Sequence, residues 1–254
     1  MGTSQSHSLK TTPQWSSVKR AMTGIIHNLE DSQRYPTFME KFLYALGEDG
    51  LYYGSSSSGR HGGGRHSGSS HKHAFGTAGS GVAVNLLNFV SDVRTTGLPQ
   101  TISLLVQEGE EVPQTPRDLI NKLCALSAKD TDANLDLDAA LAAQRKLLTE
   151  IFKTCETLED VESVLMQADE DTIDAWIIQF EVEYIIEYQG SLFQSQIFDK
   201  EQEPDMVMGQ IKRWLHSQLD SMLSDEMKHI NLFSEDGKRY IDSLTSRILE
   251  IWRR

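Results

Sequence analysis

Apolar residues recur at every third or fourth position along most of this chain, which is the spacing of one face of an α-helix. Residues 15–29 show this spacing first, and residues 36–47 repeat it between Pro36 and Gly47, which are typical start and stop signals of a helix. After Pro116 the strict apolar and polar alternation of a half-buried strand is almost absent. The pattern therefore predicts an all-α fold with short N-terminal helices.

The second half of the chain predicts an α-helical bundle. A long amphipathic helix is expected over 137–155, and a short one after Thr157, which is a suitable N-cap. The helix that opens at Asp169 is hydrophobic over most of its circumference, so we expect it at the centre of the bundle. Two further helices are expected at 205–232 and 238–252.

Residues 54–81 differ from the rest of the chain because they are rich in Gly, Ser and His. Such a stretch buries too little apolar surface to offset its backbone entropy, so it predicts a flexible loop or linker. A helical pattern resumes at Val82 and ends at Gly97, and a short helix around Ile102 precedes an acidic spacer that contains prolines. The expected regions are a flexible tail at 1–14, short helices at 15–53, the linker at 54–81, a helical segment at 82–112 and the bundle at 113–254.

Composition narrows the class of protein. With 254 residues, of which 39% are hydrophobic and 24% charged, the chain does not have the composition of a disordered or a membrane protein. No apolar run approaches the roughly 20 residues that span a bilayer, and the N-terminus lacks the features of a secretory signal. Cys124 and Cys155 fall at apolar helical positions, so we interpret them as reduced core residues. These features together predict a cytoplasmic protein.

The charge is distributed unevenly. The net charge of −13 disfavours direct binding to nucleic acid or to an anionic membrane surface. Residues 108–188 contain 20 Asp and Glu but only 6 Lys and Arg, so nearly all of the net negative charge lies there. This segment indicates either a docking face for a basic partner or a solvated acidic surface that aids solubility.

One acidic segment imitates a calcium-binding loop. From Asp130 to Asp138 every second residue is Asp or Asn, as in the ligand ladder of such a loop. The sixth position, where the turn needs Gly, is Leu135, and the twelfth, where a bidentate Glu is needed, is Leu141. The segment therefore favours a capped loop before the next helix, and no metal is expected.

Other candidate motifs lack a partner that their chemistry requires. The linker histidines His61, His66, His71 and His73 have no accompanying Cys or carboxylate. The glycine-rich residues 76–81 precede a helix as a phosphate cradle does, but they follow no apolar strand and carry no Lys-Ser or Lys-Thr pair. We therefore expect no catalytic residues and no cofactor. An acid/base pair that only the fold brings together is the alternative.

The N-terminus carries the most specific short pattern. Gly2 favours removal of Met1, which exposes the Gly2 amine, and the spacing to Ser6 also fits N-myristoylation. Residues 2–14 have no helical periodicity, so a frayed end without a function is the simpler alternative.

Several features together resemble the QatB component of the bacterial Qat anti-phage defence system. They are the opening Met-Gly-Thr-Ser-Gln-Ser, the Gly/Ser-rich interruption, and a helix that runs from Gly79-Ser-Gly-Val-Ala-Val to Gly97-Leu98. The segment Phe180-Glu-Val-Glu-Tyr-Ile-Ile and the helices at 205–252 add to the likeness. The chain departs from the family in its early part, where only Pro13-Gln-Trp15 stands for a longer Gly/Pro-rich stretch and the helices that follow contain few arginines.

The resemblance implies a non-enzymatic subunit of a four-gene defence operon. Its partners would be a QueC-like enzyme, an ATPase and a TatD-like nuclease. In related systems the QueC-like enzyme attaches a deazaguanine to the N-terminal glycine of a partner protein, so Gly2 is the implied acceptor. Thr3, Ser4, Gln5 and Ser6 are then implied to bind the QueC-like enzyme. The alternatives are an enzyme with an unrecognised acid/base site and an N-acylated membrane adaptor.

Overall fold

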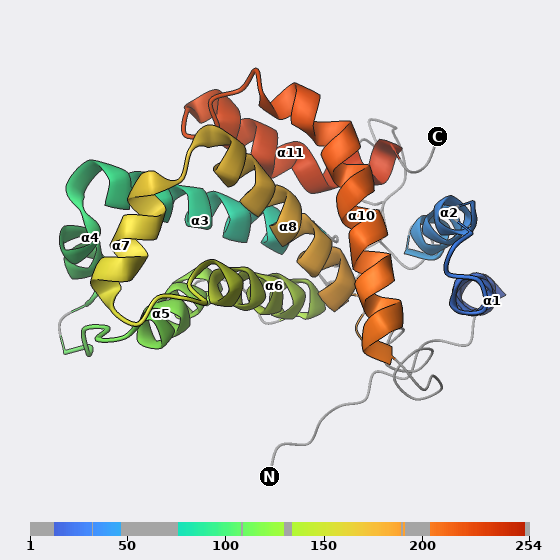
Figure 1. Cartoon of the computed structure of the whole chain (residues 1–254), viewed down its shortest axis with the longest axis horizontal. Coiled ribbons are helices and arrows are strands. Elements are labelled where there is room, and N and C mark those ends of the chain that lie inside the picture. Colours follow the sequence, from blue (N-terminus) through green and yellow to red (C-terminus); the bar gives the residue numbers. More distant parts are fainter. Residues whose placement is uncertain are drawn as a thin grey trace, which may run out of the picture.

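The computed structural model describes residues 13–31, 33–46, 76–107, 109–129, 134–188, 190 and 204–251. Within these ranges ten helices have defined bounds and no strand is present, which confirms the all-α fold (Figure 1). The helices are α1 (Pro13–Ile26), α2 (Arg34–Leu46), α3 (Thr77–Thr96), α4 (Leu98–Leu105), α5 (Pro116–Ala128), α6 (Leu135–Ile151), α7 (Leu158–Gln167), α8 (Glu170–Tyr188), α10 (Pro204–Met227) and α11 (Glu235–Ile251).

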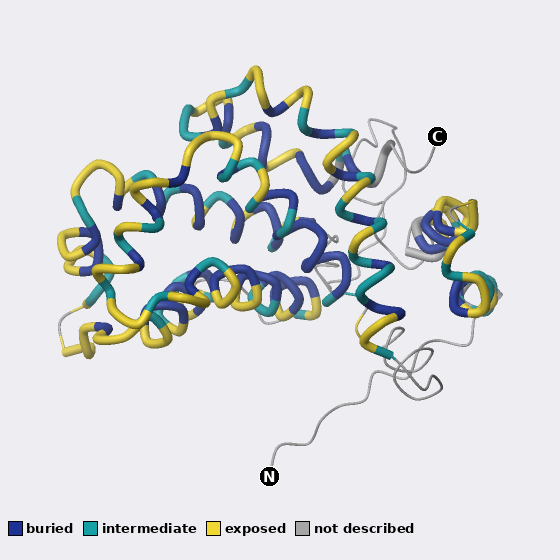
Figure 2. Tube along the Cα trace, viewed as in Figure 1, coloured by how far each residue is buried: buried dark blue, intermediate teal, exposed yellow. Residues whose placement is uncertain are grey.

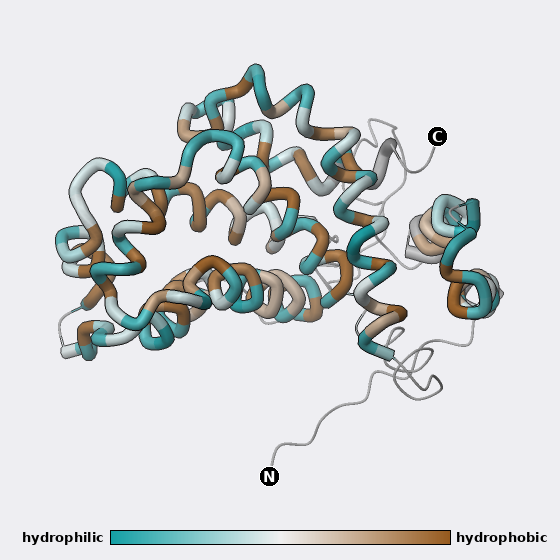
Figure 3. Tube along the Cα trace, in the orientation of Figure 1, coloured by the Kyte–Doolittle hydropathy of each residue, from teal (hydrophilic) through white to brown (hydrophobic). Residues whose placement is uncertain are grey.

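Helix α8 lies at the centre of the bundle, as its apolar circumference predicts. It packs against α6 and α10 and also contacts α3 (Figure 1). Residues 180–186 are all buried, and these include Glu181 and Glu183. Figure 2 shows that the buried positions continue from α8 into α3 and α6, and Figure 3 shows apolar positions along the same three helices. The first half of α8 keeps exposed positions such as Asp171 and Ala175, whereas neighbours cover its second half on every side.

Helices α1 and α2 form an antiparallel pair at the edge of the bundle (Figure 1). The turn between them is fixed by Arg34, which donates hydrogen bonds to the Asp31 carboxylate at 2.8 Å and to the Gly24 carbonyl at 3.2 Å. The ring of Tyr35 stacks on Trp214 of α10 with 4.9 Å between the ring centroids. The pair therefore meets the bundle through an aromatic contact at the start of α2.

Several helices begin at a polar residue that caps them, which is the signal expected from the sequence. The Thr157 hydroxyl accepts a hydrogen bond from the Asp160 N–H at 3.2 Å, and the Asp160 carboxylate accepts one from the Thr157 N–H at 2.9 Å. Thr115 and Asp118 form the same reciprocal capping box at the start of α5. The prediction that Thr157 caps a helix is confirmed.

Some predicted boundaries are wrong by a few residues. Helix α3 begins at Thr77, five residues before the expected Val82, so residues 77–81 belong to a helix and not to the linker. Helix α1 begins at Pro13 rather than Trp15. Helix α6 ends at Ile151 instead of residue 155, because residues 152–154 form turns. No helix in the described part of the chain is long and apolar enough to cross a membrane.

Candidate functional site

The start of α3 is capped by a carboxylate from another helix. The residue before this helix is Gly76, which has no side chain to cap it and adopts a φ of 104°, a conformation that favours glycine. Asp136, in the first turn of α6, supplies the missing acceptor. Its Oδ1 accepts a hydrogen bond from the Gly76 N–H at 3.1 Å, and its Oδ2 accepts one from the Ala78 N–H at 2.8 Å. Asp136 therefore joins the starts of α3 and α6.

Tyr184 of α8 completes this arrangement from the other side. Its hydroxyl donates a hydrogen bond to Asp136 Oδ1 and accepts one from the Gly76 N–H at 2.9 Å. Burial, and then the neighbouring charge of Asp136, raise the pKa of the Tyr184 hydroxyl well above its usual value. A Cβ on Gly79 would lie 2.6 Å from Cζ of the Tyr184 ring, so only glycine allows α3 to approach this ring so closely.

Glu181, one helical turn before Tyr184, carries the strongest perturbation of a carboxyl group. Its side chain is fully buried, and Thr245 of α11 donates a hydrogen bond to it at 3.2 Å. Burial is the main cause that raises the pKa of Glu181 to about 8, and the nearby charge of Asp136 adds to the effect. Glu181 is therefore mostly protonated at neutral pH. No cation forms an ion pair with it among the described residues.

We call these five residues, Gly76, Asp136, Glu181, Tyr184 and Thr245, the α3 cap cluster. Only 4% of Asp136 and none of Glu181 or Tyr184 is exposed to solvent. A carboxyl group with a raised pKa often marks an active site, but a catalytic group has to touch its substrate. In this conformation no substrate can reach the cluster. Its chemistry is that of a buried junction between α3, α6, α8 and α11.

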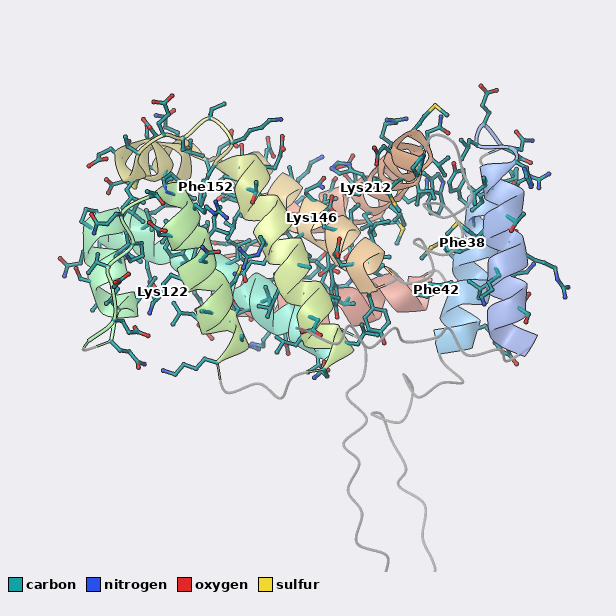
Figure 4. The ribbon with its side chains drawn as sticks, turned by 90° about the horizontal axis from the view of Figure 1, so that it is seen from below. Phe38, Phe42, Lys122, Lys146, Phe152 and Lys212 are labelled. Atoms are coloured by element: carbon teal, nitrogen blue, oxygen red, sulfur yellow. The ribbon has the colours of Figure 1, made fainter. Side chains whose placement is uncertain are left out.

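A second polar group joins three helices at the surface of the bundle (Figure 4). Lys212 of α10 donates hydrogen bonds to both Glu183 oxygens, at 2.7 and 2.8 Å, and Lys146 of α6 pairs with Glu187. Burial alone lowers the pKa of Lys146, but the hydrogen bond that Lys146 donates to Glu187 and the charges of Glu187 and Glu183 together outweigh it, so the net shift is upward. The buried Glu183 thus has charged partners, whereas the buried Glu181 has none in the part of the chain that the structure describes.

An open groove of about 540 Å³ lies where the start of α5 meets the end of α6. We call it the α5–α6 groove. Ile120 and Phe152 are buried and form its floor, and Phe152 lies between the ends of these helices in Figure 4. The other lining residues are Thr115, Pro116, Arg117, Arg145, Thr149, Lys153 and Cys155.

The α5–α6 groove is cationic although it belongs to the acidic part of the chain. Arg117, Arg145 and Lys153 are exposed at its rim, and the described residues that line it include no carboxylate. Arg145 is oriented by a hydrogen bond of 2.6 Å to the Asn121 side chain. Burial, and then the charge of Asp160, raise the pKa of the Cys155 thiol, so it is less reactive than an ordinary thiol.

A smaller pocket of about 70 Å³ lies between the start of α8 and the turn after α10. Glu170, Asp171 and Asp174 line it, and Lys228 lies opposite. Burial, followed by the charges of Asp171 and Glu170, raises the pKa of Asp174 to about 6. These residues do not form a metal site, since no three His, Cys, Asp or Glu side chains in the described ranges are placed to hold a metal ion.

The residues that the sequence proposes as a site are not among those that the structure describes. Gly2, Thr3, Ser4, Gln5 and Ser6 are outside the described residues, and so are the four linker histidines and the acidic residues 130–132. Cys124 is buried and free, as expected, whereas Cys155 is free but only partly buried at the α5–α6 groove.

Two candidate motifs resolve into structural roles. Asn134 caps α6, since its Oδ1 accepts a hydrogen bond from the Leu137 N–H at 2.9 Å, and this confirms that the helix is capped. The Gly76 and Ala78 N–H groups belong to the glycine-rich segment that precedes a helix as a phosphate cradle does, and they already bind Asp136. A carboxylate of the chain thus occupies the position that a phosphate would take.

Sequence reasoning missed both the α3 cap cluster and the α5–α6 groove. A signal for the cluster was present, because Glu181 lies between Phe180 and Val182 in a helix that is hydrophobic over most of its circumference, and an acid in such a helix is a candidate for burial. The signal for the groove was weaker. Arg145, Thr149 and Phe152 share one helical face, but their closeness to Arg117 depends on how α5 packs on α6.

Comparison of the chain with protein-family models, with curated proteins and with solved structures gives no match. The resemblance to the QatB component therefore depends on the sequence features described above. The roles that it implies for Gly2 and the four residues after it stay predictions.

Proposed function

We propose that this chain is a partner-binding subunit without catalytic activity of its own. One contrast within the structure carries the proposal. The carboxyl group with the largest pKa shift, Glu181, is sealed inside the bundle with Asp136 and Tyr184, whereas the α5–α6 groove is open and lined by exposed cations. A surface built in this way favours binding over chemistry.

The particular role proposed is that of a QatB-like component of a bacterial anti-phage system. The QueC-like enzyme of the operon is the direct partner, and Gly2 is the residue that it modifies. The sequence resemblance supports this role. The position of α1 and α2 at the edge of the bundle is compatible with it, because residues 1–12 then precede a peripheral element and not a central helix (Figure 1).

Co-expression with the QueC-like enzyme tests the proposal. The two proteins are expected to elute together, and the intact mass of this chain is expected to rise by the mass of one attached deazaguanine after loss of Met1. Gly2→Ala should abolish the mass increase. Gly81→Ala is a matched control, since a Cβ there meets no atom within 4 Å, and it should be modified as the natural chain is.

The possible results separate the two parts of the proposal. Co-elution with an unchanged mass and a free Gly2 amine would show that the substrate role is wrong, although the subunit role holds. Failure of the two proteins to elute together would overturn the choice of partner.

A further inference from the structure

The few cations of the acidic segment are concentrated in one place. Residues 108–188 contain six Lys and Arg, and three of them, Arg117, Arg145 and Lys153, line the α5–α6 groove. Lys122 and Lys146 have different roles, because they pair with Glu110 and Glu187 respectively. Half of the positive charge of the segment therefore faces one groove.

The cations of the α5–α6 groove are available to a ligand. Neither Arg117 nor Arg145 forms an ion pair with a residue in the described part of the chain. Lys153 lies 3.4 Å from Glu150, but their side chains are 68% and 72% exposed, and such surface pairs contribute little and exchange easily. The nearest acids on the flanking helix starts, Asp118 and Asp160, are held in capping boxes by backbone N–H groups.

The floor of the groove adds a second requirement for the ligand. Ile120, Phe152 and Pro116 offer an apolar surface between the cations. A free anion such as phosphate would leave this surface exposed to water, whereas an apolar side chain would cover it. The net charge of −13 also opposes the approach of a long polyanion such as nucleic acid.

We infer that the α5–α6 groove binds a short acidic and partly apolar peptide segment of a protein partner. Asp or Glu side chains of the segment pair with Arg117 and Arg145, whose planar guanidinium groups suit carboxylates, and Lys153 adds a third positive charge. A Leu or Phe of the segment packs on Ile120 and Phe152. This inference rests on the proposed function, because it names the surface that a partner uses and the chemistry that the surface recognises.

A binding assay with defined peptides tests the inference. The probe is a fluorescein-labelled pool of peptides of about eight residues built from Asp, Glu, Leu and Phe, and the comparison pool replaces the acids with Asn and Gln. The acidic pool is expected to bind at least about tenfold more tightly than the amide pool, and to weaken as salt rises.

Charge-reversal variants assign the binding to the groove. Arg117→Glu combined with Arg145→Glu should weaken binding of the acidic pool at least about tenfold. The matched control combines Arg20→Glu with Arg239→Glu, two exposed arginines on α1 and α11 that do not line the groove, and it should change affinity less than about twofold. Thr149→Glu adds a negative charge to the groove without removing a cation and should also weaken binding. Circular dichroism shows whether each variant is folded.

Equal effects of the two double variants, or the absence of acidic-pool binding, would overturn the inference. So would displacement of the peptide by inorganic phosphate or by a single-stranded octanucleotide at lower concentration than the peptide itself. Co-purification with the QueC-like enzyme tests the proposed function separately from the peptide binding of the groove. If the groove variant still elutes with that enzyme but loses the peptide, the groove serves a different partner. If the natural chain binds the peptide but no QueC-like enzyme, the proposed function fails and the groove assignment holds.

Discussion

The described helices start in two different ways. Helices α5, α6 and α7 are capped by the residue that precedes each of them, namely Thr115, Asn134 and Thr157. Helices α3 and α4 follow the glycines Gly76 and Gly97, and their caps come from distant helices. Asp136 of α6 caps α3, and Glu162 of α7 caps α4 by accepting a hydrogen bond from the Leu98 N–H at 2.8 Å.

The difference shows that a cap can act as a tertiary contact. A local cap stabilises one helix and leaves its packing free, whereas a remote cap also fixes the distance between two helices. The acidic segment supplies both kinds. Several of its 20 Asp and Glu, among them Asp118, Asp136, Asp160 and Glu162, accept hydrogen bonds from backbone N–H groups at helix starts.

Loss of the remote cap of α3 is expected to lower the free energy of unfolding more than any other change considered below. Asp136→Ala leaves the buried Tyr184 hydroxyl and the partly buried Ala78 N–H without their acceptor, and the Gly76 N–H keeps only Tyr184. The free energy of unfolding should fall by about 5 kcal/mol, measured by denaturant unfolding. Asp138→Ala, which removes an exposed carboxylate from the same helical turn, is the control and should cost under about 1 kcal/mol. A similar cost for both variants would contradict the structural role of the remote cap.

Glu181, beside that cap, should make stability depend on pH. Its pKa of about 8 in the folded chain lies above the ordinary 4.5, so the folded state holds a proton that the unfolded state releases between these values. The contribution of protonated Glu181 to the free energy of unfolding is complete below pH 4.5 and is lost as the pH rises toward 8. The natural chain should lose about 4 kcal/mol relative to Glu181→Gln between pH 5 and pH 8. Parallel stability curves for the two proteins would refute this.

The remote cap of α4 should have a smaller effect, because it serves one partly buried N–H group. Glu162→Ala should lower the free energy of unfolding by about 1.5 kcal/mol. Glu162→Gln keeps an acceptor oxygen and should recover more than half of that loss. If both variants behave alike, the hydrogen bond to Leu98 does not stabilise the chain.

Loss of a local cap is expected to lower the free energy of unfolding the least. Thr157→Ala should cost about 1 kcal/mol in thermal or denaturant unfolding, since the Asp160 N–H loses its acceptor. Thr157→Ser retains the hydroxyl and should be close to the natural chain. A larger loss than for Glu162→Ala would reverse the order that the comparison predicts.

The same distinction explains what the sequence could predict. The cap at Thr157 was predictable because its donor and acceptor lie three residues apart. The start of α3 was not, because Gly79 and Gly81 disfavour an isolated helix by about 1 kcal/mol each. Tertiary contacts override that preference, since Asp136 caps the helix and Tyr184 packs on Gly79.

The sequence could also predict that α8 is a helix and that it lies at the centre of the bundle, for a similar reason. The apolar circumference of α8 is a property of adjacent residues, and it is enough to place this helix inside the bundle. The α5–α6 groove depends on Arg117 and Arg145, which are 28 positions apart and meet only through packing. Local patterns carry no information on which surface two such residues share.

The close approach of Gly79 to Tyr184 links these two positions in evolution. Any side chain at position 79 would overlap the ring at position 184, so a larger residue at the first site requires a smaller one at the second. A smaller residue at 184 would also remove the hydroxyl that binds Asp136. Relatives that share this packing are therefore expected to keep Gly and Tyr together or to replace both, and this paired pattern offers a way to recognise them when the rest of the sequence has diverged.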